Sequence, residues 1–358
     1  MSNQIGHRIK LARKREGLSL RNLASSMNQI VSAQAIGKYE RGEMAPGSQV
    51  LLALCDALNV SLNYLLAPKN TRIGAVDFRK HSRTSAKEKA RVEAEVIHFA
   101  ERYLELDEIL GETSADWDRP GSFHELSSAE EAEQLANEVR HTWRLGTNPI
   151  PDVTELLEEK GLKVMVLALP TNVSGLTCMV SRDGSPEVPV IVVNRHHSLE
   201  RRRLTLVHEL AHRLLCIPGD EKATEKAANR FAGSFLINRA HVEGLIGRPR
   251  RSFGSREILT LKKIYRVSAA AMWYRIRQVG YVTQSQYEYG CRTFARGWRG
   301  KVEPEELEDA RSRGTLELPT FFERKCHAAL AEGMISLVKA AELLDKPVDQ
   351  VERDLKGL

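Results

Sequence analysis

The stretch Leu204-Thr205-Leu206-Val207-His208-Glu209-Leu210-Ala211-His212-Arg213-Leu214-Leu215 contains good helix formers and neither glycine nor proline. Residues four apart lie on one face of a helix, so His208 and His212 project together and can hold one Zn²⁺. Glu209 lies round the helix from them, close enough to accept a proton from water bound to the metal. Because the run is largely apolar, we expect a buried helix whose polar side chains need a partner such as a metal. The alternative is an amphipathic helix that carries two histidines by chance.

A zinc site that activates water uses three protein ligands and keeps a fourth position open. Residues 224–236 read as a second helix, with Ala228, Ala232 and Phe235 on the same stripe as Glu225. This stripe predicts Glu225 as the third ligand. Glu221 is the rival, but it precedes the helix and is expected to face water. The alternative for Glu225 is an exposed carboxylate that the helix dipole favours in the first turn.

These two stretches resemble the ImmA/IrrE family of bacterial zinc metallopeptidases. The resemblance rests on His208-Glu209-Leu210-Ala211-His212 and on Glu225-Lys226-Ala227-Ala228-Asn229-Arg230-Phe231-Ala232. In that family the third ligand is the glutamate four residues before the asparagine, which is Glu225 here. The resemblance implies an HExxH-type zinc metalloendopeptidase, with conditional activity, that cleaves a DNA-bound repressor in a stress, phage or mobile-element response.

The composition of the 358 residues is that of a globular protein, with 42% hydrophobic and 28% charged residues. No apolar run approaches the length that spans a bilayer, and the first residues contain no signal core. The five cysteines are scattered and odd in number, which argues against a disulfide framework. We therefore expect a cytoplasmic protein without a membrane partner. The net charge of +6 is compatible with nucleic-acid binding but does not establish it.

Residues 5–66 read as five short helices, with Ser19 capping the second and Ser32 capping the third. Two short helices joined by a tight turn suit reading of the DNA major groove. The segment is similar to the Xre/Cro-type helix-turn-helix family, and the turn before Ser32 is about one residue longer than usual. The matching residues are Gly17-Leu18-Ser19, Leu23-Ala24, Ile36, Lys38-Tyr39-Glu40-Arg41-Gly42, Pro46 and Leu58-Asn59-Val60-Ser61-Leu62-Asn63-Tyr64-Leu65-Leu66.

The first 66 residues contain eight basic and four acidic side chains, an excess that favours contact with phosphates. Arg13 and Arg21 belong to a basic cluster near the second helix, and Ser32 begins the third. Gln34 and Lys38 lie one turn apart on the third helix and are the predicted readers of base edges. The alternatives are a solvated helix face or a fold used only for dimerisation.

The whole chain is predicted to be α+β and mostly helical. Residues 1–67 form the five-helix DNA-binding domain, and residues 68–112 a linker with a long helix that rests on the next domain or pairs with a second chain as a homodimer. Residues 113–285 form a zincin-like metallopeptidase domain with a small sheet, and residues 286–358 a helical C-terminal region. The predicted strands cover residues 162–167, 174–180 and 188–193, with a hairpin turn at Asp183-Gly184. A helix capped by Ser127 or Ser128 precedes them.

The leading interpretation is a regulator that binds operator DNA and uses Zn²⁺ to cleave a repressor or antitoxin protein. An N-terminal domain that binds DNA would raise the effective concentration of the peptidase near the promoter it controls. One alternative is a non-catalytic regulator or toxin–antitoxin component that uses zinc for structure or sensing. Glu209 argues against it, because a structural zinc site needs no general base. A third possibility is a peptidase whose N-terminal helical domain recognises a protein instead of DNA.

Overall fold

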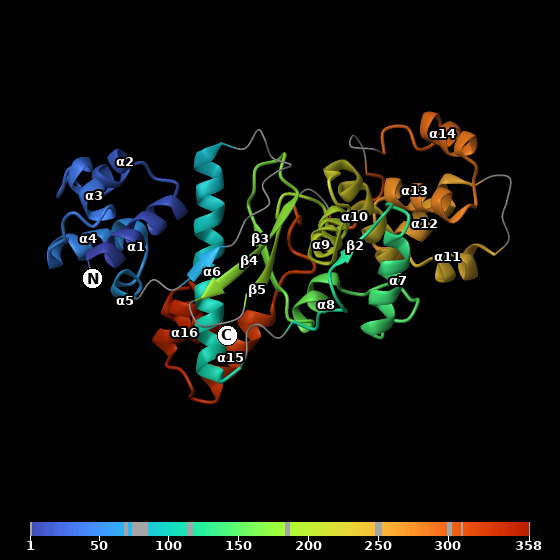
Figure 1. The fold of residues 1–358 in the computed structure, drawn as a ribbon. Helices are drawn as coiled ribbons and strands as arrows, with labels where there is room; N and C mark the ends of the chain where they lie inside the picture. The colour runs from blue at the N-terminus through green and yellow to red at the C-terminus, as the bar shows by residue number, and fades with distance from the viewer. Residues whose placement is uncertain are drawn as a thin grey trace. The chain divides into compact units, whose positions relative to one another are not determined.

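The computed structural model describes residues 2–67, 71–73, 85–112, 117–182, 187–247, 253–298, 303–308 and 311–357. They form helices α1–α17 and strands β1–β6, so the fold is α+β and mostly helical, as predicted (Figure 1). The chain divides into two compact units. Unit 1 contains Met1–Asp116, Cys178–Pro189 and Thr320–Leu358, and unit 2 contains Trp117–Thr177 and Val190–Pro319. Within the described ranges, every helix is too short or too polar to cross a lipid bilayer.

Unit 1 begins with the five predicted short helices. They are α1 (Ser2–Arg15), α2 (Leu20–Ser26), α3 (Ala33–Glu40), α4 (Ser48–Leu58) and α5 (Leu62–Leu66). The side chains of Ser19, Ser32 and Ser61 cap α2, α3 and α5, which explains where each of these helices starts. Their shared core contains Ile9, Leu23, Ile36, Leu54, Leu58 and Leu65.

The rest of unit 1 is built on one long helix, α6 (Ala86–Leu110), which starts at a capping box formed by Ser85 and Glu88. The C-terminal helices α15 (Phe321–Ala331), α16 (Leu337–Leu344) and α17 (Val348–Lys356) share a core with Leu106 of α6. The C-terminal region was predicted to be helical. Among its described residues, the first helix after α14 (Gln284–Arg292) is α15, which begins at Phe321.

Unit 2 contains the predicted metal helix α9 (Leu199–Leu214), which packs against α10 (Glu221–Leu236). Its other helices are α7 (Ala132–Thr142), α8 (Val153–Glu159), α11 (Arg239–Ile246), α12 (Ser255–Tyr265), α13 (Ala269–Val279) and α14. The predicted cap of α7 is wrong. The Glu131 carboxylate accepts hydrogen bonds from Ser127 N and Ser128 Oγ, residues 129–131 form a turn, and α7 begins at Ala132.

The sheet has the strand order β1-β4-β5-β3, and it includes all three predicted strands (Figure 1). They are β3 (Lys163–Leu167), β4 (Gly175–Arg182) and β5 (Val188–Asn194). The central β5 is buried throughout and runs parallel to β3. The predicted turn at Asp183-Gly184 lies outside the described residues.

Three further strands were not predicted. The strand β1 (Thr71–Ile73) pairs antiparallel with only the last three residues of β4, and β2 (His124–Glu125) pairs parallel with β6 (Leu215–Cys216). Each of these strands is two or three residues long, so its sequence contains no alternation from which a strand could be recognised.

A glutamate-rich stretch of unit 2, which has no helix or strand among its described residues, forms ion pairs with the surrounding helices. Residues 303–308 and 311–319, here called the acidic segment, place Glu303 against Lys262, Glu308 against Arg202 and Glu317 against Arg203. Arg202 and Arg203 lie in the first turn of α9. The acidic segment therefore holds the start of the helix that carries His208 and His212.

Candidate metal centre

Three side chains from α9 and α10 converge at one point in unit 2. The Nε2 atoms of His208 and His212 lie 3.1 Å apart, and Glu225 places Oε2 3.6 Å from His208 Nε2 and Oε1 3.3 Å from His212 Nε2. A tetrahedral zinc site with bonds near 2.1 Å separates its ligand atoms by about 3.4 Å. The three observed distances bracket this value, so the residues fit a single zinc ion.

The packing of α9 on α10 creates this convergence. Leu210, Ala211 and Leu214 of α9 and Ala228 and Phe231 of α10 are buried in the same core, so the helices meet on their apolar stripes. The side chains of the three candidate ligands are 9%, 16% and 27% exposed, in the order His208, His212 and Glu225. The centre thus opens toward solvent on the Glu225 side, where a fourth ligand can enter.

The first turn of α10 fixes the position of Glu225. Asp220 caps the helix through Ala223 N, and the Thr224 hydroxyl binds Ile217 N at 2.8 Å. The rival carboxylate, Glu221, is exposed at the first residue of α10. The described groups with metal-binding geometry include Glu225 with the two histidines and do not include Glu221.

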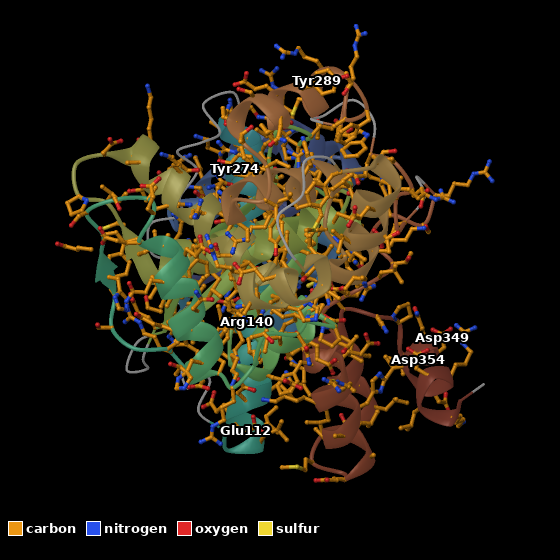
Figure 2. The ribbon with its side chains drawn as sticks, turned by 90° about the vertical axis from the view of Figure 1, so that its right-hand side faces the viewer. Glu112, Arg140, Tyr274, Tyr289, Asp349 and Asp354 are labelled. Carbon is orange, nitrogen blue, oxygen red and sulfur yellow. The ribbon has the colours of Figure 1, made fainter. Side chains whose placement is uncertain are left out.

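Two charged clusters also hold α10 against its neighbours. Arg140 of α7 is buried and donates to the Phe235 carbonyl at 2.6 Å, near the end of α10 (Figure 2). Glu133 of α7 pairs with Arg230 of α10 and Arg275 of α13. Burial acts to raise the pKa of Glu133, but the two guanidinium groups outweigh it and lower this pKa to about 2. Glu133 therefore stays charged at neutral pH and keeps α10 in place.

The predicted general base, Glu209, is buried beside the first residue of β4. A Cβ atom added to Gly175 would lie 3.6 Å from Glu209 Cγ, but only 2.5 Å from Thr205 Cγ2 and 2.7 Å from the Val192 carbonyl oxygen. Only glycine therefore lets β4 lie this close to α9. Gly175 was not predicted, because its only signal in the sequence is a glycine within a β-rich run.

A second group of potential metal ligands lies in unit 1, formed by Glu323, His327 and Asp354. Asp354 projects from α17, the helix that also carries Asp349 (Figure 2). Lys346 Nζ lies 2.5 Å from Glu323 Oε1 and 3.3 Å from Asp354 Oδ2. The ammonium group already supplies the positive charge between these carboxylates, so this cluster reads as a surface ion-pair network.

The residues predicted to contact DNA differ in their availability. Arg21, Ser32, Gln34 and Lys38 are all exposed on α2, on α3 or at the cap of α3. Arg13 instead forms a two-pronged ion pair with Glu40, with Nε–Oε1 at 2.5 Å and Nη2–Oε2 at 2.9 Å. This pair joins α1 to α3, so Arg13 positions the exposed helix. Asn28 and Gln29 both adopt the left-handed conformation in the turn before Ser32.

Comparison with known families finds two matches in this chain. Residues 9–65 match the family model described as helix-turn-helix, and residues 157–277 match the IrrE N-terminal-like domain of peptidase family M78. The second match covers β3, β4, β5 and the helices α9 and α10 that carry the candidate ligands. The chain thus combines a helix-turn-helix domain with a metallopeptidase-like domain. None of the curated proteins matches the chain significantly.

Proposed function

We propose that this chain is a DNA-binding transcriptional regulator with a zinc-dependent endopeptidase domain, which cleaves a repressor or antitoxin protein. The observation that carries the proposal is the convergence of His208, His212 and Glu225, with ligand atoms 3.1 to 3.6 Å apart. The matches to a helix-turn-helix and to an M78 peptidase family support joining the two activities in one chain.

Zinc bound by these three residues would polarise a peptide carbonyl and lower the pKa of water toward neutrality. Glu209, next to His208 on α9, is the carboxylate that would accept the proton and later return it to the leaving amine. Only 8% of Glu209 is exposed, so few bulk water molecules can hydrogen-bond to its carboxylate in place of the metal-bound water.

The start of β4 offers a place for an extended substrate. Among the described residues, β1 pairs with Val180–Arg182 of β4, and Gly175 lies at the other end of this strand, beside Glu209. On the other side of β4, Ser174 O accepts a hydrogen bond from Asn194 N at 2.9 Å. A peptide added as a strand at this edge would present its backbone near the metal centre.

Metal analysis tests the site directly. The wild-type protein is expected to retain about one zinc ion per chain after dialysis against a weak chelator. His208→Ala and Glu225→Ala are expected to lose most of it, because two remaining protein ligands hold zinc weakly. His327→Ala serves as the matched control from the Lys346 cluster and should keep the wild-type content. Equal zinc in all four proteins would remove the assignment.

DNA binding is tested by two variants with different expected signatures. Gln34→Ala is expected to weaken binding to the operator by about 1–3 kcal/mol and to relax its sequence preference. Arg21→Ala is expected to weaken binding to every duplex equally and to lower the slope of the salt dependence by about one. Gel shifts across a salt series measure both effects, with DNA from upstream of the gene and a scrambled duplex. Lys263→Ala in unit 2 is the control, and unchanged binding by Gln34→Ala would contradict base reading by α3.

A further inference from the structure

Arg201 differs from its charged neighbours at the start of α9. Glu200 meets Lys262 at 2.9 Å, Arg202 meets Glu308 at 2.8 Å, and Arg203 pairs with Glu317. Arg201 is exposed, and its Nη2 donates to the hydroxyl of Ser174 at 2.8 Å. Within the part of the chain that the structure describes, it has no carboxylate partner. Of the four charges in this turn, only this one is left for a ligand to neutralise.

The position of Arg201 relates it to the proposed cleavage site. Arg201, Thr205 and Glu209 follow one another at intervals of four, so they lie along one face of α9. Ser174 and Gly175 lie over this face, in contact with Arg201 at one end and with Thr205 and Glu209 farther along. Eight residues of helix span about 12 Å, which equals three to four residues of an extended peptide.

The surroundings of Arg201 keep its charge uncompensated. Burial, followed by the charge of Arg201, lowers the pKa of the neighbouring His197 to about 4, so this histidine is neutral at neutral pH. Arg313, whose charge also acts on His197, is paired with Glu306 at 2.9 Å. Although Arg201 is exposed overall, the covered part of its side chain is desolvated, which lowers its pKa with no opposing contribution from an acidic group. A carboxylate brought by a ligand would offset this cost of desolvation.

We propose that Arg201 selects substrates that carry aspartate or glutamate three or four residues from the cleaved bond. The proposal rests on the proposed peptidase function, since it places the substrate along β4. It assigns a specificity-determining role to a residue outside the metal centre, and it makes the preferred substrate an acidic segment of protein.

The experiment separates recognition from cleavage by using the zinc-loaded Glu209→Gln protein. The immobilised protein selects from a library of random 12-residue peptides, and the bound peptides are sequenced. Acidic residues are expected to be enriched at one position, by about tenfold over glutamine and asparagine. Adding Arg201→Ala should abolish this enrichment, and adding Arg201→Glu should replace it by enrichment of lysine and arginine. The control Arg256→Ala, an exposed arginine of α12, should leave it unchanged.

The possible outcomes distinguish the two proposals. No selected peptides, no acidic enrichment, or the same enrichment with Arg201→Ala would each overturn the role of Arg201. The selected peptides are then incubated with the zinc-loaded wild-type protein. If acidic peptides are bound through Arg201 but are not cut, the peptidase proposal fails while the recognition role stands. If peptides are cut without an acidic preference, the recognition role of Arg201 fails while the peptidase proposal stands.

Discussion

Glu209→Gln is expected to lower peptide cleavage by roughly 10²–10⁴-fold while zinc remains bound at the wild-type level. Glutamine has nearly the shape of glutamate, so it preserves the packing of this buried position beside Gly175. It cannot accept a proton, so the general base is removed without disturbing the three candidate ligands. Turnover is measured by mass spectrometry on a digest-derived peptide library, and zinc by elemental analysis of the same samples.

The matched control is Glu221→Gln, which makes the same chemical change at the exposed first residue of α10. It should leave both cleavage and zinc content unchanged. A Glu209→Gln protein that retains zinc and cleaves peptides at the wild-type rate would contradict the proposed mechanism. If the wild-type protein also supports regulation without any cleavage, the zinc serves structure or sensing instead.

The local parts of this molecule could be predicted from the sequence because their causes are local. The helix that carries His208 and His212 follows from a run of helix formers without glycine or proline. The starts of α2 and α3 follow from Ser19 and Ser32, whose side chains accept hydrogen bonds three residues ahead. The proximity of Glu225 to the histidines was inferred from an apolar stripe, because that stripe must face the core.

The parts that could not be predicted depend on residues far apart in the sequence. Gly175 is required only because Thr205 and Val192 come close to it, and nothing around Gly175 indicates either contact. Arg201 looks like Arg202 and Arg203 in the sequence. Only the positions of distant glutamates show that, among the described residues, Arg202 and Arg203 have carboxylate partners and Arg201 has none. A basic run therefore suggests a charged surface without revealing which charge is available.

Arg13 illustrates the same limit for the DNA-binding domain. A basic cluster near the second helix predicts phosphate contacts, but the sequence does not show that Glu40 lies within reach of Arg13. The pair leaves Arg21 and Lys38 as the exposed cations among the predicted contacts. Spacing locates a functional surface, whereas the assignment of individual charges needs the tertiary contacts.

The ion pairs of the acidic segment can be tested for their contribution to holding the start of α9, the helix that carries His208 and His212. The Glu308 carboxylate is fully buried and accepts hydrogen bonds from Arg202 and from the backbone N–H groups of Thr315 and Leu316. Burial acts to raise the pKa of Glu308, but these donors outweigh it and lower the pKa below its usual value. For Glu317 the balance is opposite, since burial outweighs Arg203 and the pKa is raised. Of these two carboxylates, Glu308 is therefore the one whose charged form is favoured in the folded state.

Glu308→Gln is expected to destabilise unit 2 by about 3–5 kcal/mol, because it leaves the buried Arg202 guanidinium without a counter-charge. Thermal unfolding should shift down by roughly 10 °C for a unit of this size. Because the pKa of Glu308 is lowered in the folded state, its contribution is present near neutral pH and is lost as the pH falls through the folded value. The difference in unfolding free energy between wild type and variant should therefore shrink in acid.

The control is Glu306→Gln, which breaks the partly exposed pair with Arg313 and should cost less than about 1 kcal/mol. Equal melting of the two variants would mean that the acidic segment does not hold the start of α9.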